Sequence, residues 1–338
     1  MFGFRILQSL TIGTAFLVGA SAQADIPSLD ALDQQWPKTD LTDAKFMRDE
    51  LMVHGDRNVI PPLNEPQFLP LALARHVAGL EPVITVSIDG VERAYPMRIV
   101  AAHGIVNDDV NGTPIAVTYC RICAASMVFV REVGGDRTRL GMAGVSLDNN
   151  LVLFDEATET WWQQINGLGL AGAYKDGTLQ VVASKIESFA KFKTRMSDRR
   201  DAVVLRDSER SRIPLASRLA IDLPSEAGLP PGVSPIDRVV IVDERAFSLE
   251  LLRQERRVEE DDLVILWEPG RLAGPDAFGR EAGQDVGNVD VFRRGEDGIL
   301  RDEAYRINLG HTLRDLVKTG EVHVLPPEIE RVLPDELQ

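Results

Sequence analysis

Short segments of alternating hydrophobic and polar residues dominate the chain from Pro82 onward. The segment PVITVSIDGVERAYP alternates around Asp89-Gly90, and the segment HGIVNDDVNGTPIAVTYC alternates around Asn111-Gly112. Asp-Gly and Asn-Gly tolerate the positive φ values that two-residue hairpin turns require, so each segment predicts a β-hairpin. A third turn is expected at Gly134-Gly135, between MVFVREV and DRTRLGM.

Helix-like stretches between these strands are brief. We expect a short helical turn at 97–102, a strand at 178–183, a helix at 186–196 and a strand at 202–206. Many short strands separated by turn residues are typical of mainly β proteins. The predicted fold is therefore mainly β with a few short helices (α+β), built from barrel-like or sandwich units.

Composition divides the chain into five parts. Residues 1–24 combine an early positive charge, a short apolar stretch and the ending Ala22-Gln23-Ala24, a pattern typical of a secretory signal peptide cleaved before Asp25. Residues 25–70 are expected to form an N-terminal arm that wraps the fold, and residues 71–221 a β-rich domain. Residues 222–237 are rich in proline and glycine and predict a linker to a second β-rich half at 238–338.

The second half resembles a degenerate copy of the first. RVVIVDERAFSLELL parallels PVITVSIDGVERAYPMRIV, with Arg245-Ala246-Phe247 in place of Arg93-Ala94-Tyr95. DDLVILWEP parallels TPIAVTYCR, and we place Trp267 at the position of Cys120. The second half then lacks thiols, so any thiol chemistry belongs to the first half.

Charge and hydropathy limit the partners. The net charge is −15, which disfavours nucleic acid and anionic membrane surfaces. No segment reaches the roughly eighteen uninterrupted apolar residues that a membrane span needs. We expect a periplasmic or secreted protein that binds a metal ion or a small molecule, with no membrane span and no indication of a protein partner.

Both cysteines of the chain, Cys120 and Cys123, lie in the string TYCRIC. In a hairpin that turns at Asn111-Gly112, the numbers of opposed residues add to 223, which places His103 opposite Cys120. Opposed β-carbons lie about 5 Å apart, so an imidazole and a thiolate could share one ion. Thiolates with an imidazole suit zinc or copper, and the predicted metal site consists of His103, Cys120 and Cys123.

Neighbouring residues extend this predicted site. Asn107 or Asp108 could hydrogen-bond the imidazole, although both residue types also serve hairpin turns. Tyr119, Glu159, Trp162 and Gln164 are predicted to line a pocket, and the alternative is a core tryptophan whose N–H meets an amide. The other histidines, expected in surface or cap positions because they show no ligand-like spacing, are His54, His76, His311 and His323.

Two alternatives to metal binding stay open. Cys120 and Cys123 could act as a redox dithiol, with Cys120 as nucleophile and Cys123 as resolving thiol, although a strand rather than a helix is predicted to follow them. They could also form a structural disulfide in a non-enzymatic ligand-binding or assembly module, but so short a loop stabilises by only about 2 kcal/mol. Zinc or copper binding is the preferred hypothesis, and whether the protein is an enzyme stays undecided.

The assembled motifs resemble a family of secreted bacterial and archaeal proteins of unknown function with a TYCPLC signature. The resemblance covers about 61–205 and is weak beyond the linker. Residues that carry it are Arg93-Ala94-Tyr95-Pro96, His103–Asp108, Thr118–Cys123 and, in a D-x-x-T-E-S-x-W-x-Q pattern, Asp155, Thr158, Glu159, Trp162 and Gln164. Three positions depart from the family pattern, because Gly104 replaces a glutamate, Arg121 a proline and Thr160 a serine. The resemblance implies export and a shared site but no established reaction.

Overall fold

The computed structural model describes residues 31, 33–199, 201–212, 224–279, 281–314 and 321–323 of the 338-residue chain. Strands make up 41% of the structure and helices 14%, so the prediction of a mainly β fold is confirmed. The predicted signal peptide at 1–24 lies outside the described residues, as do parts of the linker and of the second half. None of the helices in the described ranges is long and apolar enough to cross a membrane.

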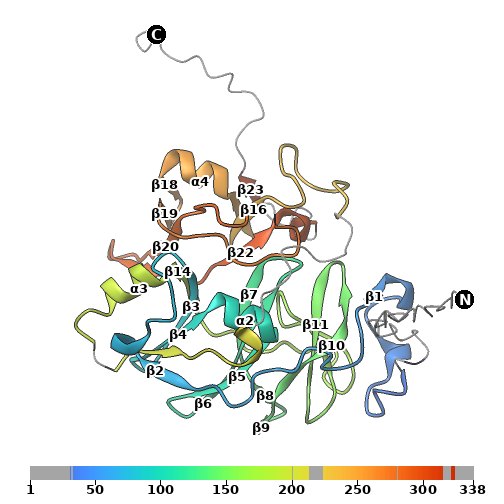
Figure 1. Cartoon of the computed structure of the whole chain (residues 1–338). Coiled ribbons are helices and arrows are strands. Elements are labelled where there is room, and N and C mark those ends of the chain that lie inside the picture. Colours follow the sequence, from blue (N-terminus) through green and yellow to red (C-terminus); the bar gives the residue numbers. More distant parts are fainter. Residues whose placement is uncertain are drawn as a thin grey trace, which may run out of the picture.

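Five small sheets form a propeller-like ring, and a sixth sheet is the two-stranded ribbon β8–β9 (Figure 1). Two sheets have five strands, in the spatial orders β1 (Leu51–Val53), β10 (Leu140–Leu147), β11 (Asn150–Asp155), β12 (Trp161–Gln163), β13 (Gly169–Ala171) and β14 (Ser184–Ser188), β3 (Pro82–Ile88), β4 (Val91–Pro96), β15 (Val203–Leu205), β2 (Phe68–Pro70). Two sheets have four strands, in the orders β22 (Arg306–Leu309), β16 (Arg238–Val242), β17 (Arg245–Ser248), β23 (Glu321–His323) and β18 (Arg257–Glu260), β19 (Leu263–Glu268), β20 (Asn288–Arg294), β21 (Leu300–Asp302). The fifth sheet consists of β5 (Ile105–Val110), β6 (Thr113–Cys120) and β7 (Ala125–Val130), and the ribbon consists of β8 (Glu132–Val133) and β9 (Asp136–Arg137). The short helical elements are α2 (Met97–His103), α3 (Phe189–Arg195), α4 (Leu249–Glu255), η1 (Leu41–Asp43), η2 (Arg48–Glu50), η3 (Leu71–Leu73), η4 (Arg210–Arg212) and η5 (Gly310–Leu313).

The predicted hairpins form where the turn residues indicate. Asp89 and Asn111 adopt φ values of 48° and 49°, and each is followed by a glycine with positive φ. The β5–β6 register pairs Val110 with Thr113 and Val106 with Val117, so the sum of 223 holds within the hairpin. The turn at Gly134-Gly135 closes the β8–β9 ribbon.

The two predicted helices form, with bounds that differ slightly from those expected. The turn expected at 97–102 is α2, which continues to His103 and ends at Gly104, with φ of 70°. The helix expected at 186–196 begins only at Phe189, because the side chain of Ser188 caps it by accepting a hydrogen bond from Lys191 N. The segment expected as a strand at 178–183 forms only isolated bridges, Thr178 with Leu168 and Val181 with Phe129 of β7, and the continuous strand β14 begins after it.

The two halves share one order of elements. In the first half β3, β4, α2, β5, β6 and β7 follow one another, and in the second half β16, β17, α4, β18, β19 and β20 do so. The neighbours match in direction too, because β14 and β22 run antiparallel to β3 and β16, while β15 and β23 run parallel to β4 and β17.

Equivalent hydrogen bonds correct the alignment of the two halves. Tyr119 N donates to Gly104 O over 2.9 Å, and Trp267 N donates to Arg256 O over 2.9 Å. Both acceptors are helix C-cap residues with positive φ. Trp267 therefore corresponds to Tyr119, one residue from the predicted match with Cys120, and Glu268 stands at the cysteine position.

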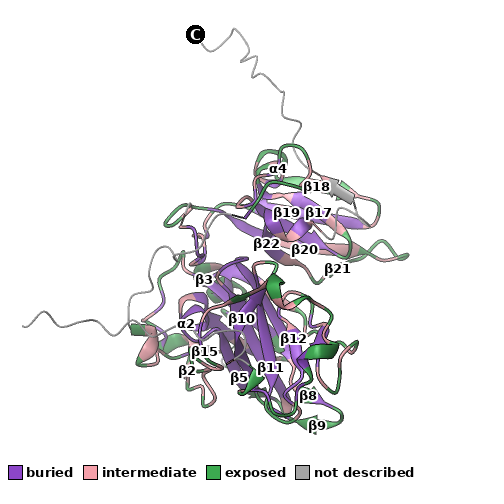
Figure 2. Ribbon diagram, turned by 90° about the vertical axis from the view of Figure 1, so that its right-hand side faces the viewer, coloured by how far each residue is buried: buried purple, intermediate pink, exposed green. Residues whose placement is uncertain are grey.

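One buried cluster joins the halves. It includes Ile84 and Val117 from the first half with Val240 and Ile265 from the second, and Figure 2 shows buried strands in both halves. Because apolar contacts cross the predicted linker region, the two halves share a core.

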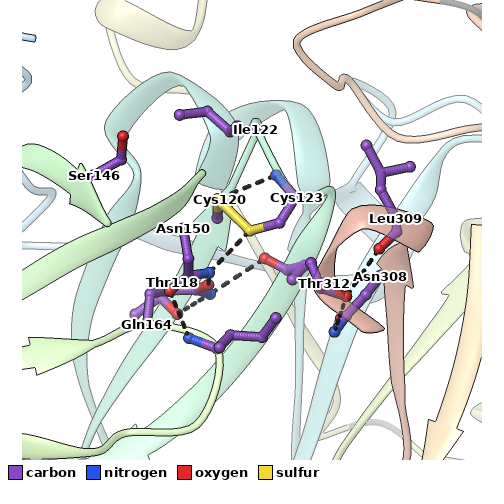
Figure 3. The surroundings of a disulfide bond; sticks show 12 residues. Thr118, Cys120, Ile122, Cys123, Ser146, Asn150, Gln164, Asn308, Leu309 and Thr312 are labelled. Carbon is purple, nitrogen blue, oxygen red and sulfur yellow. Dashed lines mark hydrogen bonds between the residues drawn. A yellow bond between two sulfur atoms is a disulfide. The ribbon is translucent and has the colours of Figure 1, made fainter. Parts of the chain in front are cut away.

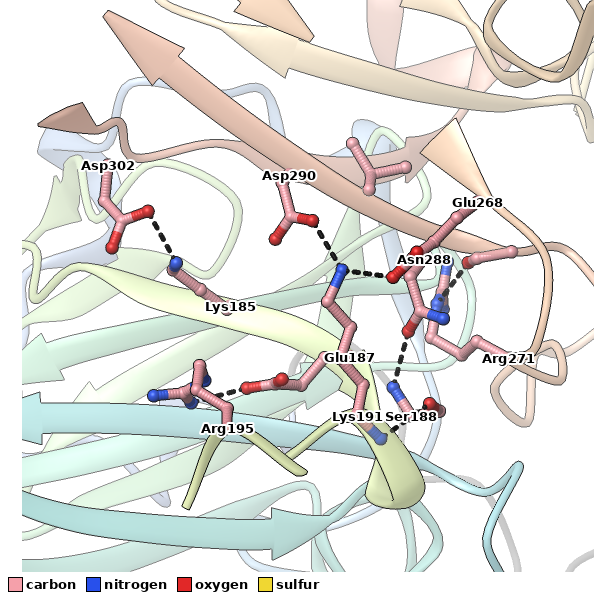
Figure 4. Close-up of polar contacts among 12 residues, drawn as sticks. Lys185, Glu187, Ser188, Lys191, Arg195, Glu268, Arg271, Asn288, Asp290 and Asp302 are labelled. Carbon is pink, nitrogen blue, oxygen red and sulfur yellow. Dashed lines mark hydrogen bonds and ion pairs between the residues drawn. The ribbon is translucent and has the colours of Figure 1, made fainter. Parts of the chain in front are cut away.

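Polar contacts also cross between the halves at β14 and α3 (Figure 4). Lys191 Nζ contacts Glu268 Oε1 at 2.6 Å and also pairs with Asp290. Lys185 pairs with Asp302 at 2.7 Å, and Ser188 N donates to Asn288 Oδ1 over 2.7 Å. These bonds hold the first half against the β19–β21 edge of the second.

Candidate redox site at Cys120 and Cys123

The two cysteines lie in a tight turn between β6 and β7. Cys120 is the last residue of β6 and pairs with Ala125, the first residue of β7. Ala124 adopts a positive φ of 49°, which turns the chain back into the sheet. Cys120 and Cys123 form a disulfide with a Cα–Cα distance of 5.6 Å. The pair therefore terminates a strand rather than opening a helix, as the sequence indicated.

Each sulfur accepts one hydrogen bond. Cys123 N donates to Cys120 Sγ over 3.3 Å, and Asn150 Nδ2 donates to Cys123 Sγ over 3.1 Å (Figure 3). The two cysteines are 1% and 0% exposed, so water does not compete for these bonds. Hydrogen bonds to the charged form favour ionisation, so both donors would stabilise thiolates after reduction.

A buried amide network supports Asn150. Gln164 is fully buried, and its Oε1 lies 3.5 Å from Asn150 Nδ2. Gln164 Nε2 donates to Thr118 Oγ1 and to Ala125 O, over 2.9 and 3.2 Å, in the two strands that flank the cysteines. Asn150 Oδ1 accepts from Ile165 N over 3.2 Å, which completes the orientation of its amide. Gln164 thus lies behind Asn150, and it does not line the pocket beside Cys120.

A mostly apolar pocket of about 420 Å³ opens beside Cys120. Cys120 contributes to its wall, whereas Cys123 does not. Its other walls include Ile60, Ala101, Gly104, Met142, Leu151, His54 and Arg210. Gly104 has positive φ, and a β-carbon there would lie 2.5 Å from Met142 Sδ, so any larger residue would displace the Met142 side chain at this wall.

His103 does not oppose Cys120. Strand pairing ends at Ile105 and Thr118, and His103 is the last residue of α2 rather than part of β5. Its Nδ1 lies 3.1 Å from Pro61 O and its Nε2 lies 2.7 Å from Ser208 Oγ. The arithmetic failed because a helix and a positive-φ glycine precede the strand, which ends the two-residue repeat.

The other predicted metal-site neighbours have structural partners. Asn107 bonds with Asn64 Oδ1 at 2.7 Å and with both backbone groups of Leu140, and Asp108 pairs with Arg93 and accepts from Tyr95 Oη. Neither residue bonds to His103, whose ring nitrogens contact Pro61 O and Ser208 Oγ. Among the described residues, no group of three or more histidine, cysteine, aspartate or glutamate side chains could hold a metal ion. Zinc or copper binding by the reduced cysteines stays a prediction.

The predicted pocket residues separate in space. Trp162 is a buried core residue, as the alternative held, but its Nε1 donates over 3.1 Å to the carboxylate of Asp155 rather than to an amide. Glu159 pairs with Arg57 at 3.0 Å and accepts from Lys38 N, so it anchors the N-terminal segment. Tyr119 is the one of these residues that lines the pocket beside Cys120; it is buried, and burial raises its pKa to about 12.

Three residues near the disulfide lacked a recognisable signal in the sequence. Asn150 follows the Asp148-Asn149 turn and resembles a turn residue, yet it bonds to sulfur. His54 lines the pocket with Nε2 2.8 Å from Ser146 Oγ, and burial lowers its pKa. His311 is 2% exposed, so the surface or cap position expected for it was wrong.

Comparison with known proteins identifies the family to which the chain belongs. The model of a family described as "Protein of unknown function (DUF3179)" matches residues 57–322, which reaches well beyond the 61–205 that the motifs indicated. Neither a curated protein nor a solved structure matches the chain. Because the match covers most of the chain, including the turn that contains Cys120 and Cys123, the chain belongs to the DUF3179 family.

Proposed function

We propose that this protein is an exported thiol–disulfide oxidoreductase whose Cys120–Cys123 pair exchanges with a small dithiol. One observation carries the proposal: Cys120 lines a pocket, while Cys123 Sγ accepts a hydrogen bond from Asn150 on the side that the pocket does not reach. A purely structural disulfide needs neither an access pocket nor a donor to its inner sulfur.

The exchange starts at Cys120. A thiolate of the substrate attacks Cys120 Sγ, a substrate–Cys120 bond forms, and the Cys120–Cys123 bond breaks with its electron pair leaving on Cys123 Sγ. The second substrate thiol then attacks the substrate sulfur of the mixed disulfide and releases Cys120 as a thiolate. The substrate dithiol is oxidised by two electrons to a disulfide, the protein disulfide is reduced to two thiols, and the two thiol protons pass to the protein or to water.

The contacts assign a role to each neighbour. Asn150 Nδ2 stabilises the leaving thiolate of Cys123, and Cys123 N stabilises the Cys120 thiolate. His54 supplies a pocket-lining imidazole as the base for the proton of an incoming thiol; burial, which lowers its pKa, favours the neutral form of the ring. Because Cys120 is only 1% exposed within a pocket of about 420 Å³, the substrate is a small molecule rather than a folded protein.

Export fits this chemistry. Disulfides persist in oxidising compartments such as the periplasm, and residues 1–24 have the pattern of a secretory signal peptide. The second half is proposed to be a duplicated copy of the first that provides scaffold alone, because Glu268 stands where Cys120 lies in the first half. Redox exchange is then confined to one site per chain.

Trapping experiments test the proposal. Incubation of a Cys123→Ser variant with glutathione disulfide is expected to give a stable adduct on Cys120, detected by intact mass. A Cys120→Ser variant should react at least about tenfold more slowly, because thiol exchange depends on access and Cys123 does not line the pocket. The double serine variant is the control. Equal rates in the two single variants, or a wild-type disulfide that resists excess dithiothreitol without denaturant, would refute the proposal.

A further inference from the structure

Two arginines line the pocket beside Cys120. Arg121 follows the cysteine directly, and Arg210 reaches the pocket from η4. The third basic side chain in the lining is His54, and burial, which lowers its pKa, favours the neutral ring. No carboxylate lines the pocket among the described residues. The pocket therefore carries positive charge in a chain whose net charge is −15.

Arg210 has two donor groups that the protein does not use. Its Nε donates to Ala102 O over 2.5 Å, whereas neither Nη group makes a hydrogen bond within the described part of the chain. Both Nη groups are open to solvent, because they are not among the buried atoms that lack a partner. Asp207, which precedes η4, pairs with Arg98 at 2.6 Å and so does not neutralise Arg210.

Arg121 adds a second positive charge to the same wall. Its Nη2 donates to Asp276 O over 3.4 Å, which is a neutral backbone acceptor. The carboxylate of Asp276 instead lies 2.8 Å from Arg238 Nη2, in a buried ion pair. An arginine keeps its charge at any pH at which the protein is folded, so both guanidinium groups attract an anion.

Burial differs between the two ends of the pocket. Met142 and Leu151 are each 7% exposed and line it with apolar surface, together with Cys120. Val59 is 47% exposed and Arg210 is partly exposed, so these two residues lie at the rim. A ligand that reaches the sulfur must bury an apolar part, while a charged part left at the rim can meet arginine.

We infer that the substrate of the proposed exchange is a small apolar dithiol that carries a carboxylate, and that Arg210 selects the carboxylate. This inference rests on the proposed redox function. The dithiol end is oxidised to a disulfide at Cys120 while the Cys120–Cys123 disulfide is reduced to two thiols, and the carboxylate stays ionised throughout. Arginine binds carboxylates through parallel N–H donors, which the two open Nη groups supply.

Two dithiols that differ only in charge test the selection. Dihydrolipoate and dihydrolipoamide share the dithiol and the chain, but only dihydrolipoate has a carboxylate. At low dithiol concentration, alkylation and intact-mass analysis should show that dihydrolipoate reduces the wild-type disulfide at least about tenfold faster. Arg210→Gln should abolish this preference and Arg210→Lys should retain part of it. Uncharged dithiothreitol should reduce wild type and Arg210→Gln at equal rates, which a merely structural role of Arg210 would not give.

Arg212→Gln is the matched control. Arg212 lies on the same turn and is exposed, and it does not line the pocket. The substitution removes the same charge from the same element, so the preference for dihydrolipoate should stay as in the wild type. Melting curves establish that each variant is folded.

Octanoate separates this inference from the redox proposal, because it has no thiol. In calorimetry on Cys120→Ser/Cys123→Ser, octanoate is expected to bind saturably and at least about tenfold more tightly than octanamide. If every dithiol leaves the wild-type disulfide intact while octanoate binds in this way, the redox proposal and the dithiol identity fail but the carboxylate site stands. The inference is overturned if dihydrolipoamide reduces the disulfide as fast as dihydrolipoate, if octanamide binds as tightly as octanoate, or if Arg210→Gln keeps the preference.

Discussion

Replacing Asn150 with leucine is expected to make the Cys120–Cys123 disulfide harder to reduce. Leucine has a similar size but removes the donor that lies 3.1 Å from Cys123 Sγ. Hydrogen bonds to charged groups contribute about 1.5–3 kcal/mol, and because sulfur is a weak acceptor we take the lower end, about 1.5 kcal/mol. The donor favours the thiolate over the disulfide, so its loss should lower the reduction potential by about 30 mV for this two-electron couple.

The other contacts of Asn150 do not change this expectation. Its Oδ1 accepts from Ile165 N over 3.2 Å and its Nδ2 lies 3.5 Å from Gln164 Oε1, and the loss of these contacts destabilises the oxidised and the reduced protein alike. The effect therefore cancels in the redox equilibrium, although it lowers the free energy of unfolding.

Equilibration with graded dithiothreitol buffers, followed by alkylation and intact-mass analysis, gives the potential directly. Gln163→Leu serves as the matched control, because Gln163 lies on the adjacent strand β12 and bonds to Asn166 rather than to sulfur. We expect no change for this control. An unchanged or raised potential in Asn150→Leu would show that the Asn150 amide does not stabilise the reduced pair.

Two further predictions concern metal and pH. If the reduced cysteines bind zinc or copper, reduced wild type should carry more metal by mass spectrometry than Cys120→Ser/Cys123→Ser, and equal contents would exclude the metal hypothesis. His311 has a pKa of about 4 in the folded protein and about 6.5 when unfolded, so the unfolded state binds more protons between these values. The free energy of unfolding should therefore fall by up to about 3 kcal/mol as the pH drops from 6.5 to 4, and urea titrations should show a smaller fall in His311→Gln.

The hairpin turns were the features that the sequence predicted best. Asp89-Gly90 and Asn111-Gly112 close their hairpins as predicted, because positive φ at these residues is a local property of the backbone. Helix ends were predicted less well, because α3 begins after Ser188, which is both the last residue of β14 and the N-cap of the helix. The segment expected as a strand at 178–183 meets β7 only through the isolated bridge of Val181 with Phe129, and the continuous strand β14, which pairs with β3, begins after it.

The sequence located the candidate site, but the residues around the cysteines differ in part from those predicted. Cys120, Cys123 and Gln164 lie together, whereas His103 ends a helix and bonds to Pro61 O and Ser208. The β10–β11 hairpin places Asn150 beside the disulfide, and the second half of the chain places His311 beside Ile122 O. Such partners depend on contacts between segments far apart in the chain, which no local pattern reports.

The sequence by itself determined the mainly β class, the principal hairpins and the turn that holds both cysteines. These features depend on short-range backbone preferences and on residue spacing. The tertiary structure decided which side chains meet the sulfurs, which sulfur faces a pocket, and that Glu268 rather than Trp267 stands at the cysteine position of the second half. Those outcomes depend on sheet register and on packing between the halves, where a shift of one residue moves a side chain to the opposite face.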